Sequence, residues 1–549
     1  MRLSLSRLLA LLPFFLCCAS RTPGQQASPA APPTATLPVP ADAAAKPHSV
    51  TETSPLLEAQ QLYREGDFDA AIEKYQEILT KEPKSATAYA GLARVYLKQK
   101  KINEANAAAK QAIDADGNSV AAHIALGEVY FRQGRLIDAE HEFAPIVQRN
   151  AKEARANYGL ARVYFASSYY FHAKIQIDIA HQLDADDPEI RRRWLGTLGF
   201  KERLKALKGY LEGENNDSDD EREHMETALA SMQGADGQVR RGCRLVSTAK
   251  TADMKLELLL KDSNHLRGVG LKVQLNGSGS TLLLDTGASG ILVDKRVAEK
   301  AGVKRLVESD FHGIGDKGPV GGYIGIADSI KVGDIEFQGC HVEVIDRRSV
   351  AEGDGLIGAD VFSHFLVDID LPNYKFRLSP LPEEPPATPD RLELQAKFPG
   401  SEHFHDRYIA PEMKGYTPIF RFGHQLLIPT RVNELPQKLF LIDTGAFSNT
   451  ISPAAAREAT KVHTDANFHV KGLNGEVKDV FTADDLTLTF SHYRQKARDM
   501  IAFETTGISN GTGTEVGGIL GFAMLRMMDL KIDYRDGLVD FGYDVNRWH

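Results

Sequence analysis

The chain has 549 residues, more than a single hydrophobic core supports, so its length predicts several domains. Acidic residues outnumber basic ones by 74 to 65, for a net charge of −9, which argues against a nucleic-acid partner because binding phosphates needs a surplus of cations. With 42% hydrophobic and 25% charged residues, the composition is that of a soluble globular protein.

The segment from Met1 to Ser20 has the pattern of a secretory signal peptide. Two arginines precede an apolar run from Leu8 to Leu16, which is too short to span a bilayer. Two endings stay open: lipidation of Cys18, or ordinary cleavage just after it. In both cases we expect an exported protein of the periplasm or cell envelope, attached to a membrane only where Cys18 carries a lipid.

Residues 21–53 are rich in Pro, Ala, Thr and Ser and contain almost no large apolar side chains. Such a segment cannot bury enough apolar surface to offset the entropy lost on ordering. We therefore expect a disordered linker between the signal peptide and the first folded domain.

A period of about 34 residues runs from about Ser54 to Pro188, and we assign residues 54–211 to one all-α domain. Equivalent positions are Ala71, Ala105 and Ala139; Phe68, Ile102 and Leu136; Leu92, Leu126 and Leu160; and Tyr96, Tyr130 and Tyr164. This is the period of the tetratricopeptide repeat, in which small residues let two helices approach and larger ones fill the seam. The resemblance implies a surface that holds a peptide or a partner protein, at positions outside the periodic core.

Residues 212–241 begin with the acidic run EGENNDSDDEREH, which predicts a solvated linker or a frayed helix. From about Met254 the pattern changes to strand-like alternation. We expect one β lobe over 242–385, a linker over 386–400 and a second β lobe over 401–549. The repeats are expected to fold separately, so that removing them would leave the lobes intact.

The strongest motif is LLLDTGASG, from Leu282 to Gly290, because it recurs as LFLIDTGA from Leu439 to Ala446. In both copies an apolar strand carries an Asp-Thr-Gly onto a turn, where glycine lets another backbone approach closely. A single Asp-Thr-Gly is an ordinary turn sequence. The duplication predicts two carboxylates, Asp285 and Asp443, that face one another.

The sequence after each motif follows the same order. A glycine-rich segment comes first, and it places Gly313 and Gly472 at almost the same offset from their aspartates. A Gly-Leu-Ile-Gly that ends at Gly358 and a Gly-Ile-Leu-Gly that ends at Gly521 come next. A strand pattern ending in Asp closes each copy. Two complete, matching lobes are therefore predicted in one chain.

This order resembles that of the aspartic proteases, over about residues 254–543. The modest length of the lobes, and the alanines Ala288 and Ala446 after the glycines, are nearer to retropepsins than to pepsin-like enzymes. The resemblance implies all-β barrel lobes, a catalytic Asp285 and Asp443, no cofactor and no metal. The implied supporting residues are Thr286, Gly287, Thr444 and Gly445, and the implied substrate-covering flap residues are Gly313, Ile314, Gly315, Gly472 and Leu473.

Two carboxylates that share one proton supply a base to activate water and an acid to protonate the substrate carbonyl, and the dyad of aspartic proteases is the standard example. Because alanine offers no hydroxyl to the ionised form, the pair is expected to titrate higher than in pepsin, with an optimum in weak acid. Two departures bear on the second lobe: Phe447 stands where the first lobe has Ser289, and its flap segment, GLNG, is poorer in glycine.

We therefore expect an exported aspartic endopeptidase that acts on peptide or protein substrates. Two alternatives stay open: a peptide-binding scaffold with degenerate lobes, and an enzyme in which each lobe pairs with its copy in another molecule. Cys243 and Cys340 are either disulfide-bonded or separate buried thiols. His403 and His405 are either metal ligands or ordinary polar surface, and two histidines without further ligands favour the latter.

Overall fold

The computed structural model describes residues 54–213, 218–234, 243–262, 265–346, 353–464 and 469–547. The expected signal peptide, Cys18 and the linker over 21–53 lie outside these residues. In the part of the chain that is described, no helix combines the length and the apolar character needed to cross a bilayer.

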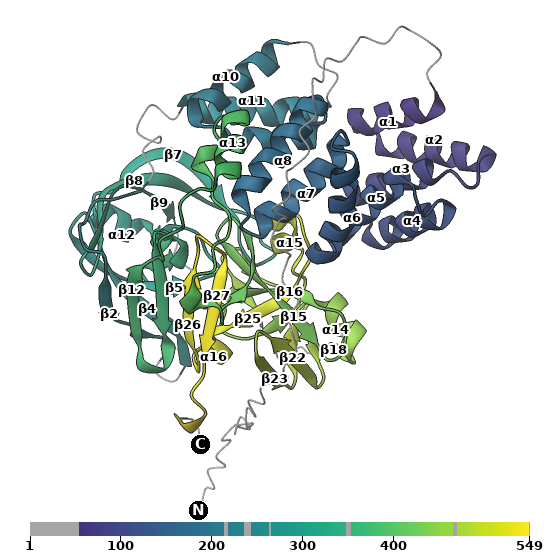
Figure 1. Ribbon diagram of the computed structural model, residues 1–549. Coiled ribbons are helices and arrows are strands. Elements are labelled where there is room, and N and C mark those ends of the chain that lie inside the picture. Colours follow the sequence, from purple (N-terminus) through teal and green to yellow (C-terminus); the bar gives the residue numbers. More distant parts are fainter. Residues whose placement is uncertain are drawn as a thin grey trace, which may run out of the picture.

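Paired helices form the first part of the molecule and strands form the rest (Figure 1), which confirms the expected class of an all-α repeat domain followed by two β lobes. The even-numbered helices α2, α4, α6 and α8 begin at equivalent positions of successive repeats, at Phe68, Ile102, Leu136 and Tyr170. The helices of this region are α1 (Pro55–Glu65), α2 (Phe68–Lys81), α3 (Ala86–Lys98), α4 (Ile102–Ala115), α5 (Val120–Arg132), α6 (Leu136–Arg149), α7 (Ala154–Ala166), α8 (Tyr170–Leu183), α9 (Pro188–Leu195), α10 (Phe200–Glu212) and α11 (Asp219–Gly234).

The periodic residues are the core of the repeats. Ala71, Ala105 and Ala139 are fully buried, which lets the paired helices pack closely. Helix starts follow from capping: Asp67 accepts the backbone N–H of Ala70, and other carboxylates and hydroxyls do the same at later helices. The regular spacing of small residues and caps therefore explains the repeat.

Both segments that we expected to be linkers contain helices. In the acidic segment 212–241, α11 packs on α10 through Met225, which is 2% exposed and lies in one apolar cluster with Leu207. Met225, Ala228, Leu229 and Met232 have the spacing of one helix face, which the neighbouring run of charges obscured. In the segment 386–400, α13 (Pro389–Lys397) packs against α8 around Phe398.

Lobe 1 is built from β1 to β12 and lobe 2 from β13 to β27. In lobe 1 a nine-stranded sheet has the order β1-β9-β6-β10-β5-β4-β8-β7, with β3 beside β4, and β8 also pairs with β9, so that the sheet closes on itself. The strands are β1 (Arg244–Leu245), β2 (Ala252–Lys255), β3 (Glu257–Asp262), β4 (His265–Leu275), β5 (Ser278–Asp285), β6 (Ile291–Asp294), β7 (Lys304–Phe311), β8 (Val320–Val332), β9 (Ile335–Ile345), β10 (Gly355–Gly358), β11 (Phe365–Asp370) and β12 (Lys375–Pro380), with α12 (Lys295–Lys300) after β6.

Lobe 2 has a ten-stranded sheet in the order β18-β21-β24-β17-β25-β16-β15-β22-β23, with β14 beside β15. Its β22 and β23 are five residues each, whereas β8 and β9 have 13 and 11, so the long hairpin that closes lobe 1 has only a short counterpart. The elements are β13 (Thr417–Pro418), β14 (Phe420–Phe422), β15 (Gln425–Val432), β16 (Lys438–Asp443), β17 (Thr450–Ile451), α14 (Pro453–Ala459), β18 (Val462–Thr464), β19 (Lys471–Gly472), β20 (Gly475–Glu476), β21 (Phe481–Ala483), β22 (Leu486–Phe490), β23 (Tyr493–Ala497), β24 (Met500–Ala502), α15 (Thr506–Thr512), β25 (Val516–Gly521), α16 (Phe522–Leu525), β26 (Asp529–Asp533) and β27 (Leu538–Gly542).

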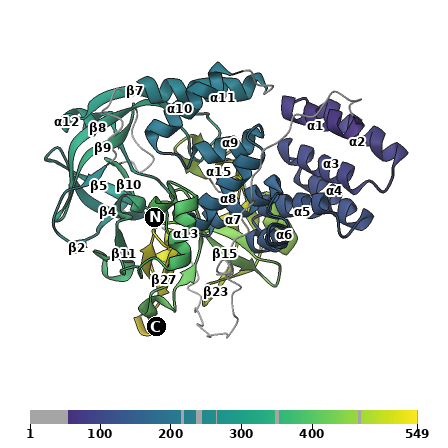
Figure 2. The same cartoon turned by 45° about the horizontal axis from the view of Figure 1, so that its top comes forward.

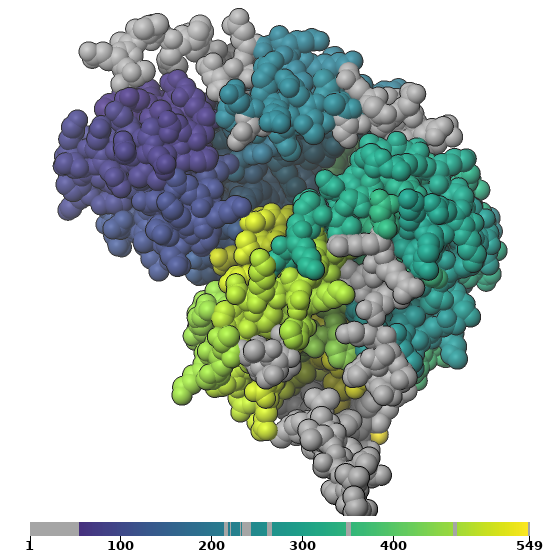
Figure 3. Space-filling model, turned by 180° about the vertical axis from the view of Figure 1, so that it is seen from behind, coloured from purple at the N-terminus to yellow at the C-terminus, as the bar shows by residue number. Residues whose placement is uncertain are grey.

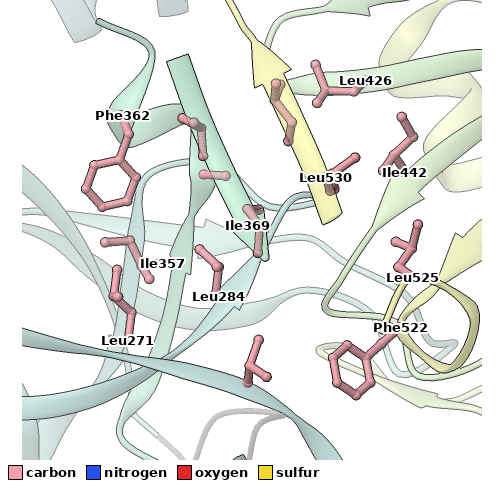
Figure 4. Close-up of a cluster of buried hydrophobic side chains, with 14 of the residues drawn as sticks. Leu271, Leu284, Ile357, Phe362, Ile369, Leu426, Ile442, Phe522, Leu525 and Leu530 are labelled. Atoms are coloured by element: carbon pink, nitrogen blue, oxygen red, sulfur yellow. The ribbon is translucent and has the colours of Figure 1, made fainter. Parts of the chain in front are cut away.

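A six-stranded sheet, β13-β27-β26-β11-β12-β2, joins the lobes through the antiparallel pairing of β11 with β26. One apolar core continues through it, as Figure 4 shows with Leu284 and Ile357 of lobe 1 near Leu530 and Ile442 of lobe 2. The two lobes therefore share a hydrophobic core and are fixed relative to one another.

The repeats share a buried core with lobe 2, and our expectation that the lobes stay folded without the repeats stays a prediction. Phe131 of α5 lies in one buried cluster with Leu439 and Val516. The backbone N–H of Glu515 donates to the carbonyl of Arg132 at 2.7 Å, and Thr514 Oγ1 donates to the carbonyl of Phe131 at 2.7 Å. Figures 2 and 3 show the later repeats lying against the β region, while α1 to α4 extend away from it. A shared core means that truncation would expose apolar surface on lobe 2.

The two cysteines beyond the signal segment form a disulfide. Cys243, just before β1, is bonded to Cys340 in β9, across a sequence separation of 97 residues. The pairing settles the alternative that the sequence left open. It ties the start of lobe 1 to its sheet, where β1 pairs with β9.

Candidate active site

Both Asp-Thr-Gly turns follow the same strand arrangement. Asp285 ends β5, which runs parallel to β10, and Asp443 ends β16, which runs parallel to β25. In each lobe the aspartate pairs in register with the late glycine, Gly358 or Gly521. The duplicated order of the sequence thus becomes a duplicated geometry, which delivers one carboxylate from each lobe to the boundary between them.

The two threonines bind across this boundary. The backbone N–H of Thr286 donates to Thr444 Oγ1 at 3.1 Å, and the N–H of Thr444 donates to Thr286 Oγ1 at 3.0 Å. Each hydroxyl in turn donates to the carbonyl of the residue before the opposite aspartate, at 2.9 Å to Ile442 and 2.8 Å to Leu284. Both threonines are fully buried, so this set of four hydrogen bonds holds the turns in one geometry.

Gly287 and Gly445 are required because the aspartate of the opposite lobe lies very close to each of them. A Cβ on Gly287 would lie 2.6 Å from Asp443 Cγ, and a Cβ on Gly445 would lie 2.2 Å from Asp285 Oδ2. Each glycine also donates its N–H to its own aspartate, at 2.9 Å in lobe 1 and 2.8 Å in lobe 2. No larger residue fits at either place without separating the carboxylates.

The two carboxyl groups are hydrogen-bonded to one another and titrate as a pair. Burial raises the pKa of Asp285 well above its ordinary value, and the charge and hydrogen bond of Asp443 raise it further. Burial also raises the pKa of Asp443, but hydrogen bonds from Ala446, Asp285 and Gly445 oppose this shift. The pair therefore shares a proton, and Asp443, which accepts two backbone N–H groups where Asp285 accepts one, has the better-stabilised carboxylate. Burial is the largest cause of both upward shifts, and the expected difference from pepsin stays a prediction.

The two predicted flap segments contact each other. Gly313, Ile314 and Gly315 lie between β7 and β8 in lobe 1, and Gly472 and Leu473 lie in the hairpin of β19 and β20 in lobe 2. A Cβ on Gly313 would be 2.8 Å from Leu473 Cβ, and one on Gly472 would be 2.3 Å from the carbonyl oxygen of Ile314. The structure therefore brings all five residues together.

Asn474 joins these segments and was not singled out in the sequence. Its backbone N–H donates to the carbonyl of Ile314 at 2.9 Å, and its own carbonyl accepts from Lys317 at the same distance. Its side-chain amide, only 3% exposed, donates to the carbonyl of Gly318. The GLNG segment, although poor in glycine, thus forms a latch with lobe 1.

Three further side chains around the dyad were missed. Arg267 Nη1 donates to the carbonyl of Gly445 at 2.7 Å, and His424 hydrogen-bonds the carbonyl of Gly287. Asp360 accepts the hydroxyl of Ser289 at 2.8 Å. One signal was present in the sequence, because Arg267 and His424 precede their Asp-Thr-Gly motifs at almost the same offset. The offsets match, but Arg and His do not resemble one another.

The two histidines that we considered as metal ligands, His403 and His405, lie in different surroundings. His403 lies beside Glu402 with its side chain 79% exposed, whereas His405 Nε2 is 3.2 Å from the carbonyl of Arg535. His405 also lies near the carboxylates of Glu384 and Asp536. Arg535 pairs with both of these carboxylates, at 3.4 and 2.7 Å, so a resident cation already balances part of their negative charge. This geometry favours an ion-pair network.

Comparison with known proteins agrees with the two halves of the structure. A model of the aspartyl protease family matches residues 271–361, which include Asp285 and Asp360. A tetratricopeptide repeat model matches residues 62–108 and 97–163. The chain carries tetratricopeptide repeats followed by an aspartyl protease domain. The resemblance stated from the sequence is thereby confirmed.

Relatives match only part of the chain. The UBA domain-containing protein Mud1 of Schizosaccharomyces pombe is 30% identical over 110 residues, which are 20% of this chain and 32% of that protein. DNA damage-inducible protein 1 of Chaetomium globosum is 32% identical over 103 residues, 18% of this chain and 22% of that protein. The chain thus spans about a third or less of these relatives. A solved tetratricopeptide repeat protein of Thermus thermophilus is 23% identical, with a TM-score of 0.28, over 33% of this chain and 97% of that one.

Proposed function

We propose that the protein is an exported aspartic endopeptidase whose active site is assembled within one chain. The observation that carries this proposal is the pair of hydrogen-bonded carboxyl groups, Asp285 and Asp443, held by four reciprocal threonine hydrogen bonds. Because these contacts join lobe 1 to lobe 2 of the same molecule, they argue against lobes that pair only between molecules.

The proposed reaction is hydrolysis of a peptide bond by an activated water. The ionised Asp443 removes a proton from water as its oxygen attacks the peptide carbonyl carbon, and Asp285 gives its proton to the carbonyl oxygen. The carbon–nitrogen bond of the tetrahedral intermediate then breaks as Asp443 gives the proton it took from water to the leaving nitrogen, and Asp285 takes back a proton from a hydroxyl of the intermediate. Only a pair with different proton occupancy does both steps, which is the state that the hydrogen bonds favour.

The repeats have a proposed role in recruiting a substrate or partner protein, as tetratricopeptide repeats generally do. Their odd-numbered helices carry a network in which Arg155 binds Glu128, Asp187 and Glu189. A ligand on this face must therefore bind around a network whose charges are already paired. Export is supported by the signal-like N-terminal segment and by the disulfide, because disulfides persist in oxidising compartments.

The test is replacement of Asp443 by Asn. We expect peptidase activity on a denatured protein substrate to fall by roughly 10³-fold, because Asn cannot accept the proton of the attacking water. The matched control is Asp485→Asn, an exposed lobe 2 carboxylate that is paired with Arg498. Wild-type activity in Asp443→Asn would show that the dyad is not the active site.

The alternative is a peptide-binding scaffold, and one observation favours it: the flap segments are latched to one another. Isothermal titration of peptides with the Asp285→Asn, Asp443→Asn double variant separates the two functions. Binding without turnover in the wild type supports a scaffold, whereas binding by the double variant together with wild-type turnover supports the enzyme.

A further inference from the structure

Arg267 and His424 occupy the same place in the two lobes. Strand β4 pairs with β5, and β15 pairs with β16, both antiparallel. In each pair, the residue two before the aspartate lies opposite the residue three after Arg267 or His424. The two side chains therefore start from equivalent points beside their own Asp-Thr-Gly turn.

Each of these side chains bonds to the opposite lobe. Arg267 donates to the carbonyl of Gly445 at 2.7 Å, and His424 bonds to the carbonyl of Gly287. The pseudo-two-fold relation thus extends beyond the Asp-Thr-Gly turns, but the charges differ. A guanidinium stays charged at every working pH, whereas an imidazole is neutral above its pKa.

A single backbone amide group connects Arg267 to Asp443. The carbonyl of Gly445 and the N–H of Ala446 belong to the same peptide unit, and that N–H donates to Asp443 Oδ1 at 2.8 Å. A charged donor on the carbonyl polarises the amide and strengthens the hydrogen bond that its N–H makes. The cation of Arg267 is thereby relayed to the carboxylate.

Lobe 1 does not reproduce this relay. Among the described residues, Asp443 Oδ1 accepts backbone N–H groups from Gly445 and Ala446, whereas Asp285 accepts one, from Gly287. The amide that His424 contacts thus makes no matching bond to Asp285. The two carboxylates receive unequal numbers of donors and unequal charge.

We propose that Arg267 is a positioning residue that keeps Asp443 ionised through the Gly445–Ala446 amide, and that the neutral His424 at the matching place leaves Asp285 as the proton carrier. The catalytic consequence rests on the proposed peptidase function. The electrostatic relay itself does not, because it is measurable in a protein that performs no catalysis.

The groups that face this pair are few. Asp443 is faced by Asp285 and Arg267, and the Tyr534 side chain adds an electrostatic interaction with Asp285. The charge of Arg267 lowers the pKa of both aspartates against the larger effect of burial.

His424 has its own set of neighbours. Burial lowers its pKa, and Arg421 lowers it further, while Asp360 and the carbonyl of Gly287 oppose these effects. The net shift is downward, which keeps the imidazole neutral at neutral pH.

The first experiment measures thermal unfolding of Arg267→Met against pH. The matched control is Arg296→Met, which removes an exposed arginine of lobe 1 that pairs with Asp294. Losing Arg267 raises the folded pKa of Asp443 further above its unfolded value, so stability falls more steeply as pH rises through that interval. We expect a Tm deficit against the control that is small near pH 4 and grows by a few degrees by pH 8.

The same measurement in two backgrounds assigns the effect. The growth of the deficit with pH should persist in Asp285→Asn and become clearly smaller in Asp443→Asn, where Arg267 acts on Asp285 alone. A deficit that is independent of pH, or that behaves alike in both backgrounds, overturns the inference and leaves Arg267 as an ordinary contact between the lobes.

The second experiment measures the pH dependence of kcat/KM. Arg267→Met should move the acid limb upward by about one pH unit, and His424→Arg should move the alkaline limb downward, because a new cation would favour loss of the proton on Asp285. Absence of peptidase activity with the expected unfolding behaviour contradicts the proposed function alone. An active enzyme whose limbs do not move contradicts the relay alone.

Discussion

The two lobes solve one structural problem with different residues. In lobe 1 the loop after the Asp-Thr-Gly is tied to the late glycine strand by Asp360, which accepts the N–H of Gly290 at 3.0 Å. In lobe 2 the same tie runs in the opposite direction, because Asn449 in the loop accepts the N–H of Gly521 at 2.7 Å. In each lobe a hydrogen bond must join the loop after the Asp-Thr-Gly to the segment around the late glycine. Different residues can make that bond.

The difference in charge has a consequence for the dyad. Asp360 is a carboxylate that interacts with His424 and Tyr534, whereas Asn449 is neutral. The groups around Asp285 are therefore acidic or neutral, and they come from both lobes. Asp443 receives more N–H donors, and one of these belongs to the amide whose carbonyl Arg267 contacts. A duplicated fold has thus diverged into unequal halves, which acid and base roles require.

The lobes also differ in what they pack against, and this contrast predicts the largest effect on stability. Leu439, on the strand that ends at Asp443, is 2% exposed in the core shared with the repeats. The matching place in lobe 1 is Thr281, which hydrogen-bonds Glu257 and Asp354 of its own lobe. Leu439→Ala should lower the free energy of unfolding by roughly 2–5 kcal/mol, because it leaves a cavity.

Thr281→Ala is the matched control and should cost much less. Hydrogen exchange read by mass spectrometry checks the prediction, with faster exchange expected in α5 and α15 of Leu439→Ala as well as in β16. Faster exchange confined to lobe 2 would show that the shared cluster does not couple the repeats to the lobe.

The contrast between these lobes also shows what the sequence could predict. The repeat period placed the helices because most of the periodic residues are buried in the repeat core, and the repeated Asp-Thr-Gly with its late glycine placed the strands that pair in register. The core between Phe131 and Leu439 could not be predicted, since apolar residues of separate domains carry no mark of their partners. Helix α11 was expected only as a linker or a frayed helix, because its apolar face lies among charged residues.

The residues of the candidate active site could also be predicted only in part. The geometry of the turn requires Asp285, Thr286 and Gly287 in lobe 1 and the equivalent residues in lobe 2. The same residue types therefore appear in both copies of the motif. Arg267 and His424 occupy equivalent positions in the two lobes but are different residue types. A comparison of the two lobe sequences for identical residues therefore does not find them. The disulfide joins cysteines that lie far apart in the sequence, and only the pairing of β1 with β9 brings them together.

The latch between the flap segments predicts a smaller effect. Lobe 2 contributes Asn474, whereas the matching place in lobe 1 is Gly315, with φ of 127° and no side chain to donate. Asn474→Ala removes the hydrogen bond from the side-chain amide to the carbonyl of Gly318 and should raise hydrogen exchange of residues 314–317 by roughly fivefold, because a hydrogen bond contributes about 1 kcal/mol.

Lys478→Ala is the control for this variant, since only its backbone N–H binds Asp316 and that group is kept. Equal exchange rates in Asn474→Ala and Lys478→Ala would show that the backbone bonds alone close the latch. If the flaps admit substrate, a looser latch should also change KM.

The last effect appears only as pH rises, and it concerns the sheet that joins the lobes, where Asp370 of β11 pairs in register with Asp529 of β26. Asp370 is bound by Arg377 and Asn373, whereas Asp529 has a buried Oδ1 without a hydrogen-bond partner. Burial, with the nearby Asp368, raises the pKa of Asp529 to about 7.

A folded pKa above the unfolded value means that the folded state holds an extra proton, so stability falls as pH rises from about 4 to 7. Asp529→Asn removes this loss, because the amide stays neutral. We expect the variant to be within error of wild type at pH 4 and more stable by roughly 1–2 kcal/mol at pH 8, a value discounted for partial exposure. Urea unfolding at the two pH values checks it, with Asp485→Asn as the exposed control. A gain of equal size at both values would mean that the benefit comes from a new amide hydrogen bond rather than from the lost charge. The contrast between Asp370, which Arg377 and Asn373 bind, and Asp529, whose nearest cation, Lys531, is 3.8 Å away, would then carry no electrostatic meaning.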